Sequence, residues 1–392
     1  MLLLKEQANE RGMKIVLNPS LYNGTINMYN LSKVSLLLIV KRKGAYRPFK
    51  QTESERMRRV GSTIREISEA TGFSPATVSN ALNHKRGVNK ETSAIIFETA
   101  HHMGYVEENK VKKLKFVIFK TNGLIIDDTP FFSLMIEGVQ KECRNFGLEM
   151  SIYNLDKRDA DYEEQVRQLA LDASSAVILL GTELEESDLS AFLNCKCPFL
   201  VLDYWVSDMS FNAVLINNAD SARTAVEYLL KKGHREIGYL RGSFRIKAFR
   251  SREVGYKVAL EKAGIEVKDT YVVTLATTMD GAYKDMKEYL SKKPKLPTAF
   301  FADNDMVALG AMKAMSEEGI QIPQQVSVIG FDDLPFCEIA SPRLSTIRVS
   351  KQEMGQIAVK RLMEIVNDSE GSKLKIQVCT QFVERESVRE LL

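Results

Sequence analysis

Long hydrophobic runs are missing from this chain of 392 residues. The apolar run Ser35–Val40 is far shorter than the ~20 residues that a membrane-spanning helix needs. The first residues also lack the pattern of a secretory signal peptide. We therefore predict a cytoplasmic protein with no membrane segment.

Cysteine and histidine are scarce, with five and four residues respectively. Cys195 and Cys197 are too closely spaced for the usual zinc motif, and no second pair of ligands lies nearby in the sequence. We interpret all the cysteines as reduced and mostly packing residues, namely Cys143, Cys195, Cys197, Cys337 and Cys379.

No arrangement of side chains in the sequence indicates catalysis. No nucleophile is spaced to meet a general base, and the histidines lie away from the candidate pocket described below. We interpret His101 and His102 as a surface pair and His234 as a structural residue. The chain is therefore predicted to be no enzyme, with no catalytic residue, no cofactor and no metal.

The formal net charge of +3 conceals an asymmetry between the two ends of the chain. Residues 1–115 hold 20 Lys and Arg against 10 Asp and Glu, whereas the remainder holds 34 against 41. A basic front end on an acidic body favours a protein whose front end meets phosphate. The length predicts two or three domains, because one small core rarely holds so many residues.

The stretch Ser62–Asn83 predicts two short helices joined by a tight turn. Thr63 and Glu66 form a capping-box pair, so the first helix can begin at the next residue, Ile64. Gly72 lies where the chain must turn, because glycine accepts the positive φ that ends a helix.

The second helix can begin after Ser74, whose side chain can cap it, with Pro75 in its first turn. A third helix is predicted from a cap at Asn89 to Gly104-Tyr105. The apolar spacing predicts one shared core of Ile67, Phe73, Val78, Leu82, Ile96, Ala100 and Met103. This is the helix-turn-helix unit, whose second helix enters the DNA major groove.

The whole string resembles the DNA-binding head of the lactose/galactose-repressor (LacI/GalR) family. The residues that carry this resemblance are Gly72, Ser74–Ser79, Leu82-Asn83, Val88, Glu91-Thr92 and Gly104-Tyr105. The resemblance covers about Ser62 to Ser387 and leaves residues 1–56 unassigned. Either the biological start is Met57, or the upstream stretch is a flexible basic arm; an intact mass of the natively expressed protein separates the two.

From Phe116 onward, short apolar runs alternate with longer amphipathic ones. The predicted strands are Phe116–Phe119, Ala176–Leu180, Phe199–Leu202, Val214–Ile216, Ile237–Leu240, Val272–Leu275, Ala299–Ala302 and Val326–Ile329. The predicted helices are Leu134–Phe146, Glu163–Leu171, Ala222–Lys231, Ser251–Lys262, Gly281–Leu290 and Met306–Glu317. Buried strands separated by helices indicate an α/β fold with two doubly wound parallel sheets.

The family resemblance continues through this part of the chain. It is carried by Val214–Gly242, Asn304-Asp305, Ala308, Gly310, Gly319, Pro323, Val326–Asp333, Pro342–Ile347 and Phe382–Ser387. It implies a two-lobed periplasmic-binding-protein-like core, with crossings between lobes near Asn217–Asp220, Thr346–Ser350 and Gly371–Gln381. The expected domains are a head at 57–106, a short basic linker at 107–115, and a core at 116–392. Lobe 1 is expected at about 116–217 and 347–372, and lobe 2 at about 218–346 and 373–392.

Polar side chains follow several predicted strands, where open parallel sheets bind ligands. Carboxylates and amides suit vicinal hydroxyls, and aromatic faces cover a sugar ring. The resemblance implies effector contacts at Phe131, Phe132, Asp203, Arg252, Asn304 and Asp332, and we add Asp128 and the single tryptophan, Trp205. Packing at a lobe edge is the alternative role for Phe131, and helix capping or loop bracing is the alternative role for Asp305 and Asp333.

The chain departs from the family after Pro342–Ile347, where Ser350-Lys351 replaces the apolar or aromatic group that the family often has. A cationic Lys351 would favour an acidic or phosphorylated sugar. We instead expect an exposed, solvated lysine.

Reading of the major groove needs side chains that reach base edges. Ala76 can contact a thymine methyl and Asn80 can pair with adenine, whereas Ser74, Thr77 and Ser79 suit phosphate contacts or capping. The family frequently has arginine where this chain has Asn80, so we expect a weakened guanine preference. The predicted DNA-binding residues are Ser74, Pro75, Ala76, Thr77, Ser79, Asn80, Asn83, Lys110, Lys112 and Lys113.

The linker Val106–Lys115 is several residues shorter than the family's hinge segment and lacks its Pro-Asn. Its sole leucine, Leu114, abuts the first strand. We therefore predict that the leucine wedge for the minor groove is absent, that DNA kinking is slight, and that the linker lysines bind phosphate instead.

Together these features predict a homodimeric transcriptional regulator of the LacI/GalR type. It would bind a double-stranded, roughly palindromic operator and be switched, as a repressor, by a sugar or sugar derivative. The alternatives are a sugar-binding protein of the transport type and a regulator that answers to a protein partner.

Overall fold

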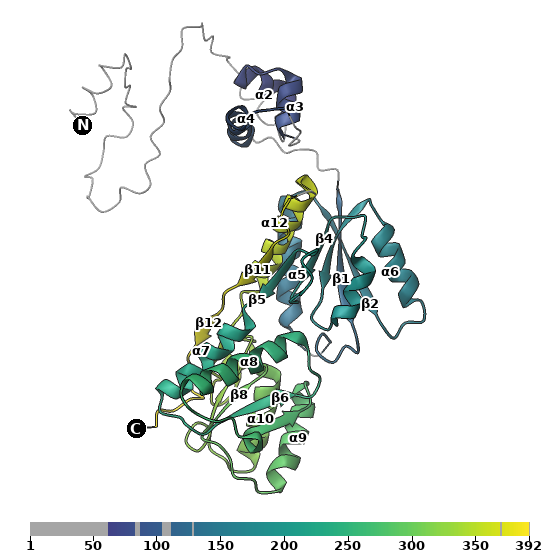
Figure 1. Ribbon diagram of the computed structural model, residues 1–392. Coiled ribbons are helices and arrows are strands. Elements are labelled where there is room, and N and C mark those ends of the chain that lie inside the picture. The colour runs from purple at the N-terminus through teal and green to yellow at the C-terminus, as the bar shows by residue number, and fades with distance from the viewer. Residues whose placement is uncertain (1–61, 83–86, 104–110, 128, 369–370, 392) are drawn as a thin grey trace, which may run out of the picture. The chain divides into compact units, whose positions relative to one another are not determined.

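The computed structural model describes residues 62–82, 87–103, 111–127, 129–368 and 371–391 (Figure 1). They form a helical head and an α/β core of two lobes, as the sequence predicted. The predicted N-terminal extension, residues 1–56, lies outside the described residues.

The head consists of α2 (Ile64–Thr71), α3 (Pro75–Leu82) and α4 (Lys90–His102). The predicted capping box is present, since the side chains of Thr63 and Glu66 each bond the other's backbone N–H. Gly72 ends α2 with φ 74°, in the left-handed region that glycine adopts at little cost.

The predicted core of the head is confirmed. Ile67, Val78, Leu82, Ile96 and Ala100 are buried together, with Phe73 and Met103 packed against them. Ala81 also belongs to this core. Helices of 8 and 13 residues are marginal in water when isolated, so these three hold together through that shared apolar face.

The first lobe contains a six-stranded parallel sheet in the order β11-β5-β4-β3-β1-β2. Its strands are β1 (Lys113–Lys120), β2 (Glu149–Asp156), β3 (Ser175–Leu180), β4 (Phe199–Leu202), β5 (Ala213–Ile216) and β11 (Lys375–Val378). Its helices are α5 (Phe131–Asn145), α6 (Tyr162–Leu171), the 3-10 helix η2 (Glu186–Phe192) and α12 (Lys351–Asn367).

Both faces of this sheet are covered. In β3, Val177 and Leu179 pack with residues of α6 and η2, whereas Ile178 and Leu180 pack with residues of α5 and α12. The alternation follows from the strand, in which successive side chains point to opposite faces. Strands buried on both sides lose the polar alternation of an exposed strand, which is why β3 appears in the sequence as a continuous apolar run.

Helices α5 and α12 pack at very short distance because each has a glycine at the contact. A Cβ on Gly138 would lie 2.0 Å from the carbonyl oxygen of Gln352, and one on Gly355 would lie 2.3 Å from that of Met135. No larger residue fits at either position without moving a backbone.

The second lobe contains a four-stranded parallel sheet in the order β7-β6-β8-β9. Its strands are β6 (Ile237–Gly242), β7 (Val272–Leu275), β8 (Ala299–Ala302) and β9 (Ser327–Ile329). Its helices are α7 (Asn218–Lys231), α8 (Lys247–Lys262), α9 (Met279–Ser291), α10 (Asp305–Glu317), the 3-10 helix η3 (Asp269–Tyr271) and the short α11 (Phe336–Ile339). Helix α7 packs on α8, and α9 packs on α10 (Figure 1).

The chain passes between the lobes near the predicted places, after β5 and through β10 (Thr346–Arg348) and β12 (Gln381–Val383), which pair antiparallel. One boundary differs from the prediction. Residues 375–378 form β11 of the first sheet, whereas the prediction assigned 373–392 to lobe 2. The strand is short and only its last residue is buried, so its sequence lacks the apolar run on which the prediction relied.

Candidate functional site

The start of α3 presents the side chains predicted to read DNA. Ser74 caps the helix by accepting the N–H of Thr77 at 3.1 Å, and the two hydroxyls lie 2.8 Å apart. Pro75 and Ala76 are exposed, and Ser79 and Asn80 are partly exposed. Asn83 lies outside the described residues. The geometry therefore assigns Ser74 to capping and leaves Ala76 at the open surface of the helix.

The three lysines predicted to bind phosphate from the linker differ in their positions. Lys110 lies outside the described residues, Lys112 is exposed just before β1, and Lys113 is the first residue of β1. The predicted linker 107–115 is therefore too long at its end, since the strand begins three residues before Phe116. Leu114 is fully buried in this strand.

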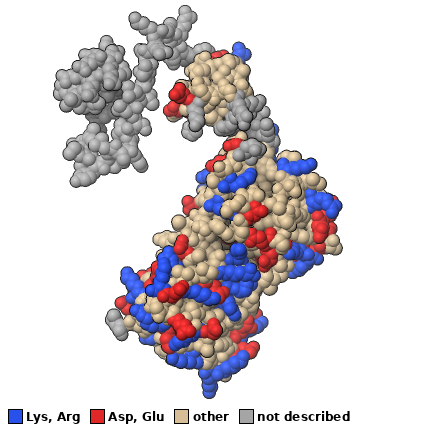
Figure 2. Space-filling model, viewed as in Figure 1, with Lys and Arg blue, Asp and Glu red and all other residues tan. Residues whose placement is uncertain are grey.

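The core carries mixed charges. On the face shown in Figure 2, acidic and basic side chains are interspersed over both lobes. Such a surface does not produce the single-sign field with which proteins attract the phosphate backbone.

Arg252, on α8, lies at the centre of a buried polar cluster at the carboxyl ends of the strands. Its Nε donates to Oδ1 of Asn218 at 2.8 Å, and its Nη2 lies 3.3 Å from Oδ1 of Asp332. A third bond goes to the carbonyl oxygen of Asp303. The guanidinium lies 3.6 Å from the ring centroid of Phe331. Arg252 and Asp332 therefore lie in one cluster, and their predicted role as effector contacts stays a prediction.

Asn304 is present in the same cluster, but its side chain is already engaged. Its Oδ1 accepts the N–H of Val307 at 2.9 Å and so caps α10. Its neighbour Asp303, which the sequence did not single out, is fully buried and accepts hydrogen bonds from Tyr239, Gly242 and Arg245. Burial raises the pKa of Asp303 to about 6. Asp303 follows β8 directly, and this position after a predicted strand is the sequence signal that could have identified it as a site residue.

Asp305 and Asp333 brace loops, which was the alternative that the sequence left open for them. Asp305 accepts the hydroxyl of Thr346 at 2.6 Å and the N–H of Leu334 at 2.9 Å. Burial, followed by the charge of Asp332, raises the pKa of Asp305 to about 7. Asp333 binds Arg348 and Arg385, at 2.6 and 2.7 Å.

Asp203, after β4 of the first lobe, has an acceptor without a partner. Its Oδ2 accepts the hydroxyl of Thr182 at 2.7 Å, whereas Oδ1 is buried and has no hydrogen-bond partner. Burial raises the pKa of Asp203 to about 6, and the charges of Arg252 and Asp332 in the second lobe also act on it. A buried carboxylate oxygen left unpaired costs free energy, so this atom marks a place where a donor is expected.

Lys351 contradicts the prediction that it is exposed and solvated. It is 5% exposed, and its Nζ donates to the carbonyl oxygens of Asp332 and Asp333. The ammonium also lies 5.4 Å from the ring centroid of Phe131. The prediction was wrong because the turn from β10 into α12 points the first residue of that helix inward. Burial lowers the pKa of Lys351.

Phe131 and Phe132 begin α5 and are buried, with ring centroids 5.1 Å apart. The loop before them is organised by Glu183, which sequence reasoning missed. Its carboxylate, 2% exposed, accepts five backbone N–H groups at 2.9–3.3 Å, those of Thr121, Asn122, Gly123, Ile125 and Ile126. Asp128 lies outside the described residues.

Trp205 is 39% exposed, and the ammonium of Lys375 on β11 lies 5.3 Å from its ring centroid. The indole therefore contacts a side chain of β11, the edge strand of the first sheet. Its predicted role in the effector site stays a prediction.

His234 is structural, as predicted. It is fully buried, with Nδ1 2.9 Å from Oγ1 of Thr298 and Nε2 3.1 Å from the carbonyl oxygen of Arg389. Burial lowers its pKa. Within the described ranges, no three His, Cys, Asp or Glu side chains are placed to hold a metal ion. Nor does any helix there have the length and apolarity to cross a bilayer.

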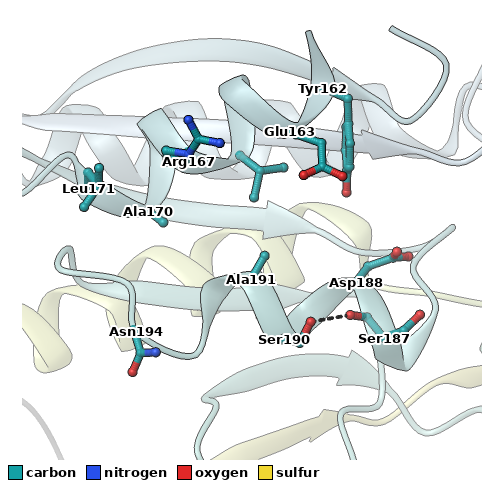
Figure 3. A pocket seen from close by; sticks show the side chains of 11 residues that line it. Tyr162, Glu163, Arg167, Ala170, Leu171, Ser187, Asp188, Ser190, Ala191 and Asn194 are labelled. Atoms are coloured by element: carbon teal, nitrogen blue, oxygen red, sulfur yellow. Dashed lines mark hydrogen bonds between the residues drawn. The ribbon is translucent and has the colours of Figure 1, made fainter. Parts of the chain in front are cut away.

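A separate groove of about 470 Å³ lies between α6 and η2 (Figure 3). It is lined by polar and apolar side chains, among them Tyr162, Arg167, Asp188 and Asn194. No residue of the predicted effector set lines it, so it is distinct from the cluster around Arg252.

Comparison with known proteins identifies the family of this chain. The periplasmic binding protein-like domain matches residues 226–388. The HTH-type transcriptional repressor PurR of Photorhabdus laumondii is 30% identical over 332 residues, which are 83% of this chain and 97% of that protein. The chain belongs to the LacI/GalR family of transcriptional regulators.

Solved structures agree with this assignment. The Escherichia coli transcriptional repressor ascG is 26% identical, with a TM-score of 0.61 over 71% of this chain and 100% of that one. The Lac repressor dimer bound to operator has a TM-score of 0.62 over 84% of this chain and 99% of that one; at 22% identity it supports the fold. As a LacI/GalR member, the protein is a DNA-binding transcriptional regulator switched by a small molecule.

Proposed function

We propose that this LacI/GalR regulator is a cytoplasmic, homodimeric repressor, without enzymatic activity, whose effector is a sugar or sugar derivative bound at the cluster around Arg252. Two identical heads would read two half-sites of an operator. The similar Lac repressor is a dimer on its operator, which supports this assembly. Ala76 and Asn80 are the proposed base contacts, and Lys112 a proposed phosphate contact.

The observation that carries the effector proposal is the unpaired Oδ1 of Asp203. A hydroxyl of a bound ligand would supply the donor that this buried acceptor lacks. Asp332 and Arg252, from the second lobe, act electrostatically on the same carboxyl group, so a ligand bonded to Asp203 would connect the two lobes.

The proposed effector residues are Phe131, Phe132, Asp203, Arg252, Asn304 and Asp332. The two phenylalanine rings suit the apolar face of a sugar, and the charged groups suit its hydroxyls. Because Asn304 caps α10 through Oδ1, only its amide nitrogen is left to donate to a ligand. Ligand binding between the lobes would change the separation of the heads through the lobes' relative position.

A thermal-shift screen against neutral sugars, sugar acids and sugar phosphates tests the effector. We expect at least one compound to raise the midpoint temperature of the wild type and of the surface control Glu261→Gln, but not of Asp203→Asn. The same compound should change the affinity for an operator selected from random duplexes. A regulator that prefers one duplex but responds to no compound would reject the sugar effector, whereas one with no preferred duplex would reject the DNA-reading residues.

A further inference from the structure

Cys195 and Cys197 form a close thiol pair in the loop between η2 and β4. Their Sγ atoms lie 3.2 Å apart. Cys195 is partly exposed, whereas Cys197 is buried. The sequence suggested only packing roles for both, because their spacing fits no zinc motif and does not show that the side chains meet.

The backbone holds the two thiols together. The N–H of Cys195 donates to the carbonyl oxygen of Phe192 at 3.1 Å, and that of Lys196 donates to the carbonyl oxygen of Ala170 at 2.9 Å. On the other side, the carbonyl oxygen of Pro198 accepts the N–H of Val177 at 2.9 Å. The loop is thus bonded to the end of η2, to α6 and to β3, and the contact between the sulfurs is part of that structure.

The two thiols have different chemical characters. Contact with the Cys197 thiol, together with the N–H groups of Cys197 and Lys196, lowers the pKa of Cys195 to about 7. Contact with Cys195 and burial raise the pKa of Cys197. The accessible sulfur is therefore partly thiolate at neutral pH, beside a partner that keeps its proton. Thiolate is the reactive form of cysteine, and attack is fastest when the pKa lies near the ambient pH.

We propose that Cys195 and Cys197 are a redox-active dithiol, a modification site that hydroperoxides convert to an intramolecular disulfide. The Cys195 thiolate attacks the terminal oxygen of the hydroperoxide and breaks its O–O bond. Cys195 becomes a sulfenic acid, and the remaining alkoxide takes up a proton and leaves as an alcohol. The Cys197 thiol then attacks that sulfur and water leaves. Two thiols lose two hydrogen atoms in all, and one hydroperoxide becomes one alcohol and one water.

The remaining cysteines provide internal comparisons. Cys143 and Cys337 are buried, and burial raises the pKa of each, in Cys143 to about 11. Cys379 is exposed. It therefore reports simple accessibility to a reagent, and Cys195 must react faster than Cys379 if the thiol contact matters.

The test treats the reduced full-length chain with cumene hydroperoxide, alkylates the remaining thiols and maps its peptic peptides by mass spectrometry. We expect the peptide that contains both residues to lose two hydrogen atoms before Cys379 is oxidised, and a dithiol reductant to reverse the change. In Cys197→Ser, a sulfenic-acid trap should label Cys195. In Cys195→Ser, Cys197 should stay reduced at the same dose, and Cys379→Ser should behave as wild type.

Phenylarsine oxide gives a second reading without an oxidant. It bridges paired thiols with release of water, so one adduct per chain is expected in the wild type and in Cys379→Ser, and none in either single variant of the pair. The proposal is overturned if Cys195 is oxidised no faster than Cys379, if a sulfenic acid persists on Cys195 of the wild type, or if the arsenical adduct survives loss of one thiol of the pair. Thermal unfolding of each variant checks that it is folded.

Discussion

Nη2 of Arg252 lies 3.3 Å from Oδ1 of Asp332, and both side chains are buried. One residue comes from the middle of a helix and the other from the loop after a strand, 80 positions apart. Burial raises the pKa of Asp332 although the charges of Arg252 and Lys351 oppose this. Burial and the two neighbouring cations therefore act in opposite directions on this carboxyl group.

Replacement of Arg252 by methionine should destabilise the fold. It leaves Asp332 and Asn218 without their shared partner, and loss of one member of a buried ion pair typically costs about 3–5 kcal/mol. Urea unfolding measures the change. The matched control is Arg250→Met, two residues away, because Arg250 has a side chain 54% exposed and only a 3.8 Å ion pair with Glu185. It should cost under about 1 kcal/mol. Equal losses in both variants would contradict the assigned role of Arg252.

Asp305 should make the fold less stable as pH rises. Its pKa is about 7 in the folded chain against an ordinary value of 3.8, so between these values the folded state holds a proton that the unfolded state releases. Stability from this group is therefore present below its unfolded pKa and is lost as pH rises toward about 7. Asp305→Asn should fall less steeply in unfolding free energy than the wild type between those pH values, measured by urea unfolding at several pH values. An unchanged slope would refute the raised pKa.

Glu183 should hold the loop before α5. In Glu183→Gln, one oxygen is replaced by an NH₂ group that faces backbone donors, so several charge-assisted bonds are lost, at about 3 kcal/mol or more in total. Hydrogen exchange of residues 121–126 should accelerate, whereas the surface variant Glu261→Gln should leave it unchanged. Slow exchange in the glutamine variant would mean that the loop holds its shape by packing.

Asn80 should specify adenine. Binding selection on random duplexes should show an adenine at one position of each half-site, and Asn80→Ala should relax that position at a cost of about 1–3 kcal/mol. Affinity at the other positions should change little. A strict guanine requirement that disappears in Asn80→Ala would contradict the assignment.

Lys112 should contribute to affinity but not to sequence preference. In Lys112→Ala, the slope of log affinity against log salt should fall by about one, as expected for one phosphate contact, with the selected sequence unchanged. With Leu114 buried in β1, the operator should be bent only slightly. A strong bend at the operator centre in a circular-permutation gel would show that another residue acts as the wedge.

Local chemistry made the head predictable from sequence. The capping box of Thr63 and Glu66, the left-handed Gly72 and the cap at Ser74 each act within a few residues, so no tertiary information was needed to place α2 and α3. The buried parallel strands were predictable for a related reason, since strands covered on both faces are apolar at every position.

Most of the elements that the sequence did not reveal lack those signals. β2 is an edge strand with exposed Ile152 and Tyr153, so it shows no apolar run. α12 is an exception, since its buried residues Met354, Ala358, Val359, Leu362 and Met363 recur at helical spacing, and the prediction overlooked it; its position against α5 depends on the close approach of Gly355, a contact between distant segments. β10 and β12 are three residues each and exist because they pair with one another.

The sequence by itself determined the helix-turn-helix, the α/β lobes and the order of polar residues after strands, because capping and periodicity are properties of neighbouring residues. Only the tertiary structure decided which of those polar residues meet. In the folded chain, Lys351 is buried beside Asp332 and Asn304 caps a helix. Glu183 accepts backbone N–H groups of a distant loop, and Oδ1 of Asp203 has no partner. Hydrogen-bond partners and burial depend on distances between segments far apart in the chain, and no local pattern encodes them.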